Sequence, residues 1–126
     1  MISPEQQAYG TIRRLCHEAV DVEVYDFNPP AETPYPFVRI GEQMTRHERI
    51  TKQLINGDTD ITIHFWHNDV YQRGTLTSMM YAVEQAIIEE FGARGEGITS
   101  QVIDDNTTGS TLLHGILEVT IKRYKQ

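Results

Sequence analysis

Histidine offers the widest range of chemistry in this chain, which has five of them. His64 and His67 are three residues apart in a segment that alternates like a β-strand, so they are expected on opposite faces. Asp69 follows closely, and His64 and His114 are candidate neighbours on adjacent strands. Spacing implies no third ligand for either pair, whereas functional zinc sites need three or four converging ligands. We therefore expect no metal ligands and no cofactor.

The serines and paired acids do not indicate catalysis either. The serines fall at a helix cap, within a helix, in a strand and beside a turn, without the pattern of a nucleophile elbow: Ser3, Ser78, Ser100 and Ser110. The acidic pairs at residues 89–90 and 104–105 adjoin element ends, where solvated surface explains them. Nothing suggests the burial that tunes a carboxyl pKa for catalysis. We expect no catalytic residues, and a protein that is not an enzyme.

Composition indicates one acidic domain. A chain of 126 residues is long enough for a single core, so residues 1–126 are assigned to one domain. The net charge of −7 argues against attraction of the whole monomer to nucleic acid or an anionic membrane, but not against a local basic patch. Cys16 cannot form an intramolecular disulfide and is expected to be buried in the first helix. The chain has no long apolar run and no disulfide, so we expect it to be made in the cytoplasm and to have no membrane partner.

Residues 57–91 organise the predicted fold. A turn at residues 57–60 leads into a strand over residues 60–67, with Ile61, Ile63 and Phe65 on one face. A helix over residues 70–91 follows, capped by Asn68 or Asp69 and ended by Gly92. Its apolar stripe contains Leu76, Met79, Met80, Val83, Ile87 and Phe91. This helix is expected to pack on the apolar face of the strand.

The remaining elements complete an α+β pattern. Ser3 and Pro4 begin a first helix that ends near Ala19. Strands are predicted over residues 20–27, 37–42, 98–104 and 111–124, with proline-rich chain between the first two. Short connections between the central strands favour antiparallel pairing. The sequence therefore predicts a mostly antiparallel sheet of four to five strands with two helices on one face.

Two features point to contacts with other molecules. Residues 43–56 carry several basic groups against one acid, and we predict a mobile arm, or hairpin excursion, there. The last strand has a partly apolar second face, which suggests that a neighbouring subunit covers it. Together these features give a candidate assembly interface: Arg46, His47, Arg49, Lys52, His114, Ile116 and Glu118.

The order of these pieces resembles the tail-completion family of long-tailed bacteriophages and prophages, also called tail terminators or tail-to-head joining proteins. The resemblance covers nearly the whole chain. It is carried mainly by the stretch YPFVRIGE at residues 35–42 and by the strand ITIHFW at residues 61–66 with its following helix. The long basic arm and the glycine-rich turn at residues 92–97 differ from the family pattern.

The resemblance implies a structural virion protein without enzymatic activity. It implies a homo-oligomeric ring, usually a hexamer, at the head-proximal end of the tail tube, where the partners are the tail tube protein and the head connector. Opposite charges on the acidic body and the basic arm would orient head-to-tail assembly. A rival role for the arm is contact with DNA in the lumen of the ring through Arg46, Arg49 and Lys52.

Three alternatives remain open at this point. One is another head–tail connector or a tail-tube subunit. A second is a small metal-dependent enzyme that uses His64, His67 and Asp69. A third is a small ligand-binding domain, which would form no ring.

Overall fold

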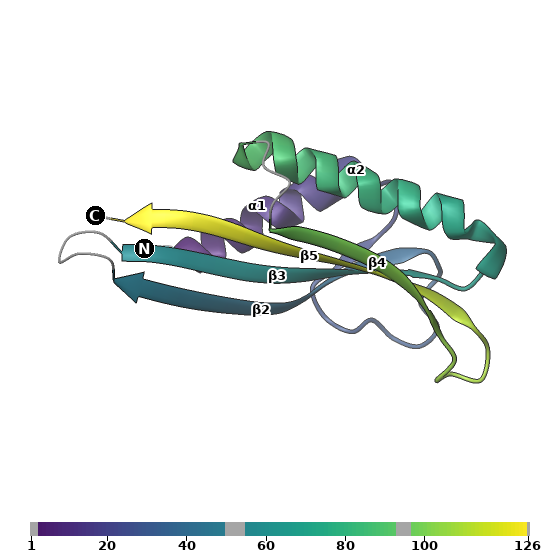
Figure 1. The fold of residues 1–126 in the computed structure, drawn as a ribbon. Helices are drawn as coiled ribbons and strands as arrows, with labels where there is room; N and C mark the ends of the chain where they lie inside the picture. The colour runs from purple at the N-terminus through teal and green to yellow at the C-terminus, as the bar shows by residue number, and fades with distance from the viewer. Residues whose placement is uncertain (1–2, 50–54, 93–96, 126) are drawn as a thin grey trace.

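The computed structural model describes residues 3–49, 55–92 and 97–125. Along the chain these residues form α1 (Pro4–Ala19), β1 (Val24–Tyr25), β2 (Phe37–Arg49), β3 (Ile55–His67), the short 3-10 helix η1 (Val70–Gln72), α2 (Arg73–Phe91), β4 (Ile98–Asp105) and β5 (Leu112–Lys125). Figure 1 shows the long β2, β3 and β5 strands lying side by side. None of the described helices is long and apolar enough to cross a membrane.

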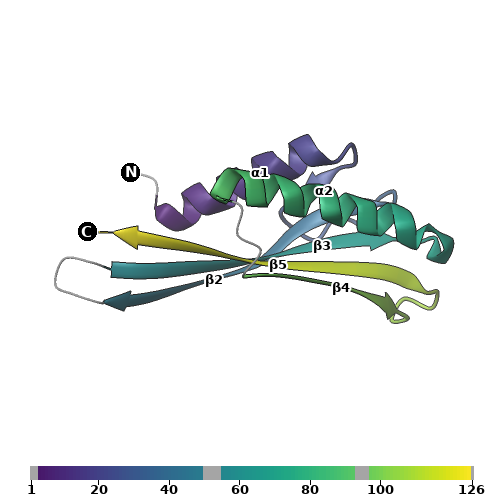
Figure 2. The same cartoon turned by 45° about the horizontal axis from the view of Figure 1, so that its top comes forward.

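The strands form a single sheet in the order β1-β2-β3-β5-β4. Only the short β1–β2 pair is parallel, and the other three pairs are antiparallel. Figure 2 shows both α1 and α2 on the same face of this sheet. The predicted fold class, a mostly antiparallel α+β sheet with two helices on one face, is therefore confirmed.

The hydrophobic core lies between the helices and the sheet. Ile61, Ile63 and Phe65 of β3 are fully buried, as their alternation predicted. They pack with buried residues of the helices and of β5, among them Ile12, Cys16, Leu76, Val83, Leu113 and Leu117. The predicted stripe of α2 is buried at most of its positions, but Phe91, in the last turn, is 40% exposed. Burial of the Cys16 thiol raises its pKa to about 12, which suits an unreactive core residue.

Local signals set the helix ends. The hydroxyl of Ser3 accepts a hydrogen bond from the Gln6 amide at 3.1 Å and caps α1. Asp69 caps η1 by accepting from the Tyr71 amide at 2.9 Å. Gly92 ends α2 in the left-handed conformation, with φ +103°, which glycine adopts without strain.

Three predicted boundaries are wrong. Residues 57–60 are not a turn, because β3 already begins at Ile55 and pairs on both sides. The strand predicted over residues 37–42 is longer than expected, because β2 continues to Arg49 and residues 43–49 pair with β3. The strand expected over residues 20–27 shrinks to Val24–Tyr25, since only these two residues find partners on β2. The predicted mobility of the arm stays a prediction, and residues 50–54 lie outside the described part.

Candidate assembly surface

The face of the sheet away from α1 and α2 is here called the outer face. No helix covers it in the described residues (Figure 2). The proline-containing loop before β2 borders one end of it, beside Trp66. The strand registers place the following residues there: Arg39, Met44, Arg46, Asp58, Asp60, His64, Trp66, Ile103, His114, Ile116, Glu118, Thr120 and Lys122.

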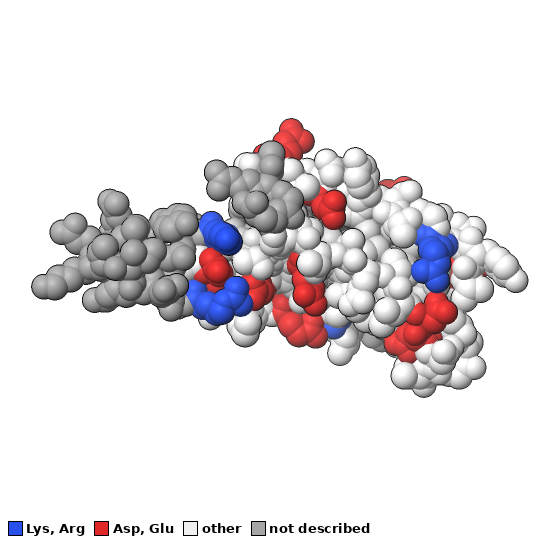
Figure 3. Space-filling model, in the orientation of Figure 1, with Lys and Arg blue, Asp and Glu red and all other residues white. Residues whose placement is uncertain are grey.

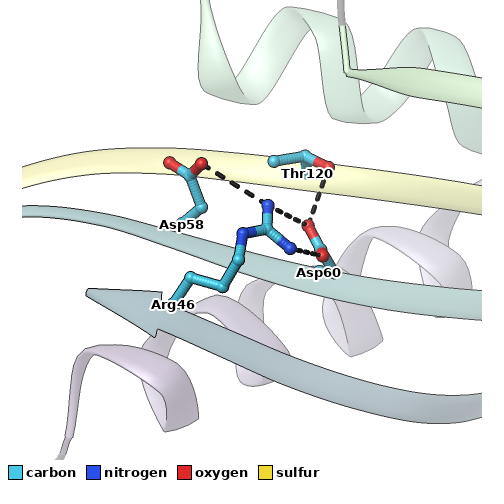
Figure 4. Close-up of polar contacts among 4 residues, drawn as sticks. All are labelled: Arg46, Asp58, Asp60 and Thr120. Atoms are coloured by element: carbon cyan, nitrogen blue, oxygen red, sulfur yellow. Dashed lines mark hydrogen bonds and ion pairs between the residues drawn. The ribbon is translucent and has the colours of Figure 1, made fainter. Parts of the chain in front are cut away.

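Arg46 is held on the outer face by two acids from β3. Figure 4 shows its guanidinium between Asp58 and Asp60. Arg46 Nη1 donates to Asp60 Oδ2, while Nη2 lies 3.2 Å from Asp60 Oδ1 and 3.5 Å from Asp58 Oδ2. The Thr120 hydroxyl of β5 donates to Asp60 Oδ1 at 2.8 Å, so the cluster spans three strands.

The charge of Arg46 is therefore balanced within the chain. Its hydrogen bond to Asp60 lowers the pKa of that carboxyl and raises the pKa of the guanidinium. The Arg46 side chain is half exposed, so this pair contributes little to stability. The pair matters for the charge of the surface: Arg46, one of the basic groups expected to bind a partner, is already paired with Asp60.

A second cluster joins β2, β3 and β5 through two histidines. His64 Nδ1 lies 2.7 Å from His114 Nε2, and His64 Nε2 lies 2.8 Å from Glu42 Oε1. Trp66 stacks on the His114 ring at a centroid distance of 3.8 Å. A Cβ at Gly41 would come within 2.7 Å of the His64 ring, so glycine makes room for this arrangement. The predicted contact between His64 and His114 is confirmed as a diagonal one.

The surroundings of His114 favour its neutral imidazole. Desolvation, with the neighbouring His64 ring as a second cause, lowers the pKa of His114 to about 4. The hydrogen bond from His64 lowers the pKa of Glu42, which keeps that carboxylate ionised as an acceptor. Glu42 accepts from His64 Nε2, and the short contact between His64 Nδ1 and His114 Nε2 is a single hydrogen bond that the neutral His114 ring can make.

These histidines do not make a metal site among the described residues, where no group of three possible ligands converges. Glu42 and His114 approach opposite nitrogens of His64, so they cannot share one ion with it. The amide of Asp69 donates to His67 Nδ1 at 3.2 Å. The Asp69 carboxylate is used as a cap, so the metal alternative gains no support from the geometry.

The structure brings several of the predicted interface residues together. His114, Ile116 and Glu118 alternate along β5 and share the outer face with Arg46. The backbones of His47 and Arg49 belong to β2, but their side chains and all of Lys52 lie outside the described part. Sequence reasoning missed the two acids that bind Arg46, because it placed them in a turn.

The outer face carries both acidic and basic side chains. Figure 3 shows acidic and basic groups next to each other on the side that it displays. A hollow of about 330 Å³ beside the β2 irregularity is lined by Glu42, Asp60 and Glu118 among others. These carboxylates, with Arg46 engaged, give no support to a lumen surface that attracts DNA.

Comparison with known proteins gives a likeness of fold. No protein-family model matches the sequence, and no curated protein matches it. Among solved structures, the chain is similar to a chain in the virion of a native gene transfer agent particle. The TM-score is 0.60 at 14% identity, and the alignment covers 91% of each chain. At this identity the likeness establishes the shared fold.

Proposed function

We propose that this chain is a structural protein of a phage-like virion. The observation that carries the proposal is the likeness, over 91% of both chains, to a component of a gene transfer agent virion. The outer face, which no helix of the described residues covers, supports it, because virion subunits function in contact with other copies or other proteins. The proposal includes location in the virion and a role without catalysis.

Within the virion, we propose the tail-terminator role: a ring, most simply a hexamer, at the head-proximal end of the tail tube. The resemblance of residues 35–42 and 61–66 to tail-completion proteins supports this narrower role. Its partners are other copies of the chain, the tail tube protein and the head connector. Another connector component or a tail-tube subunit is the nearest alternative.

Light scattering coupled to size exclusion tests the assembly, first on the chain alone and then with tail tubes. A ring-sized mass, or capture at one end of each tube seen by electron microscopy, is the expected result. Incorporation along the tube would identify a tube subunit instead. A monomer that ignores tubes would contradict the virion proposal, and metal and ligand binding would then be the next measurements.

A further inference from the structure

In the described part of the chain, the sheet has an open backbone edge on each side. There β4 is the last strand on one side and pairs only with β5. On the other side, β1 pairs with β2 only at Val38 and Arg39. Among the described residues, positions 43–49 of β2 therefore pair with β3 alone. An unpaired edge presents N–H and C=O groups that template further pairing, and neither stretch contains the proline that often blocks it.

We propose that copies of this chain join by antiparallel pairing of the outer edge of β4 with residues 43–49 of β2 in the next copy. The proposal rests on the ring proposed above and names its subunit contact. Successive strands from β2 through β3 and β5 to β4 alternate in direction. A second copy in the same orientation thus meets β4 with an antiparallel β2, and repetition gives a head-to-tail assembly.

Side-chain direction restricts the register of this contact. A slip by one residue would exchange the two faces of the sheet, so outer-face residues must lie opposite outer-face residues. Placing Ile103 opposite Met44 meets this condition and pairs residues 98–104 with 43–49 along their whole length. Ile103 is 42% and Met44 is 55% exposed, and they are the two exposed large hydrophobic residues in the described strands. The same register sets Gln101 opposite Arg46.

This register requires neighbouring copies to be staggered. Within one chain Ile103 is level with His114, whereas Met44 is level with Asp60 and Thr120, six residues further along β5. Six residues correspond to about 20 Å along the strands, and four strands advance about 19 Å sideways. The strands then incline by about 45° to the axis of the assembly, close to the tilt of roughly 35–45° in closed barrels. The stagger is thus compatible with closure.

Paired cysteines test the register directly. Opposed residues in antiparallel strands have Cα atoms about 4.5–5.5 Å apart, within reach of a disulfide. Met44→Cys combined with Ile103→Cys is expected to give a ladder of covalently linked subunits on mild oxidation. The matched control, Met44→Cys with Thr99→Cys, places the second thiol four residues away and is expected to give none. Cys16 is fully buried and stays out of the reaction.

The outcomes separate this contact from the proposed function. A ring-sized mass by light scattering without the ladder, or with the same ladder in the control, would overturn the edge contact and leave assembly standing. A dimer from Ile103→Cys alone would indicate two-fold β4–β4 pairing and also overturn it. A monomer under every condition, tail tubes included, would contradict the proposed function and this contact together.

A charge on the open edge provides a second test without cross-linking. Ile103→Lys is expected to shift the scattering mass from assembly to monomer, because lysine on an edge strand opposes pairing. Tyr81→Lys is the matched control, since Tyr81 is also an exposed hydrophobic residue, at 63%, but lies on α2. Equal behaviour of the two folded variants, judged by circular dichroism, would count against the edge contact.

Discussion

Acid should destabilise this fold through His114, and His114→Gln should remove most of that effect. Burial and the His64 ring lower the pKa of His114 to about 4, from about 6.5 in an unfolded chain. The unfolded chain therefore binds a proton more readily between these two values. Stability is complete above about pH 6.5 and falls as the pH is lowered toward 4.

The magnitude follows from the pKa difference and the exposure. A lowering of about 2.5 units corresponds to a ceiling of about 3.4 kcal/mol at 1.36 kcal/mol per unit. His114 is only half-buried, so solvent screening reduces this figure, and we expect a loss of about 1–2 kcal/mol between pH 7 and 4.5. Glu42 has a lowered pKa too, but its contribution is lost only below its ordinary range, at lower pH.

Urea unfolding followed by tryptophan fluorescence measures this loss. Trp66 is the single tryptophan and stacks on His114, so its emission reports the cluster itself. His114→Gln keeps a hydrogen-bond donor toward His64 but does not titrate, and its stability should change little between pH 7 and 4.5. If wild type and His114→Gln lose the same stability over this interval, the assignment to His114 is wrong.

Three further predictions concern stability and are checked by the same urea unfolding at pH 7. A Cβ at Gly115 would lie 2.5 Å from the Met80 sulfur, so Gly115→Ala should lower the free energy of unfolding by about 1–3 kcal/mol. The double variant with Met80→Ala should lose less stability than the two single variants added together, because the new methyl group fills part of the space that Met80 leaves. Strictly additive losses would refute this. Ser3→Ala should cost about 1 kcal/mol through loss of the α1 cap, whereas Ser3→Gly should cost a few tenths, and equal losses would contradict the capping role. Arg46→Met should change stability by less than about 1 kcal/mol because the Asp60 pair is partly exposed, and a loss above about 2 kcal/mol would show that this pair is more than a surface interaction.

The order of the elements could be predicted because its signals are local. In β3 the apolar residues Ile61, Ile63 and Phe65 alternate with polar ones, and in α2 the apolar positions recur at helical spacing. The buried side of each element can therefore be identified before the fold is known. The caps at Ser3 and Gly92 also depend only on neighbouring residues. For these features, local preference and tertiary packing agree.

The extension of β2 and β3 could not be predicted because its stabilisation is non-local. Gly57, Asp58 and Asp60 have the composition of a turn, yet β3 pairs with β2 on one side and β5 on the other throughout this stretch. The helix-facing residue there is Thr59, fully buried but polar, so the usual alternation of hydrophobicity is weak. Pairing on both sides overrides the turn preference.

Non-local contacts also decide which residues are available at the proposed interface. In the sequence, Arg46 stands in a basic run, and its partners come twelve and fourteen residues later, so its charge looks available when it is not. Met44 and Ile103 are the opposite case, because their local sequences do not mark them as residues available for a contact. The strand register nevertheless places each of them on an open edge of the sheet and on the same face. The proposed subunit contact therefore rests on the backbone edges and their matched hydrophobic residues and not on a free basic arm. Pairing of one edge with the other can repeat from copy to copy, whereas a locally neutralised charge gives no such direction.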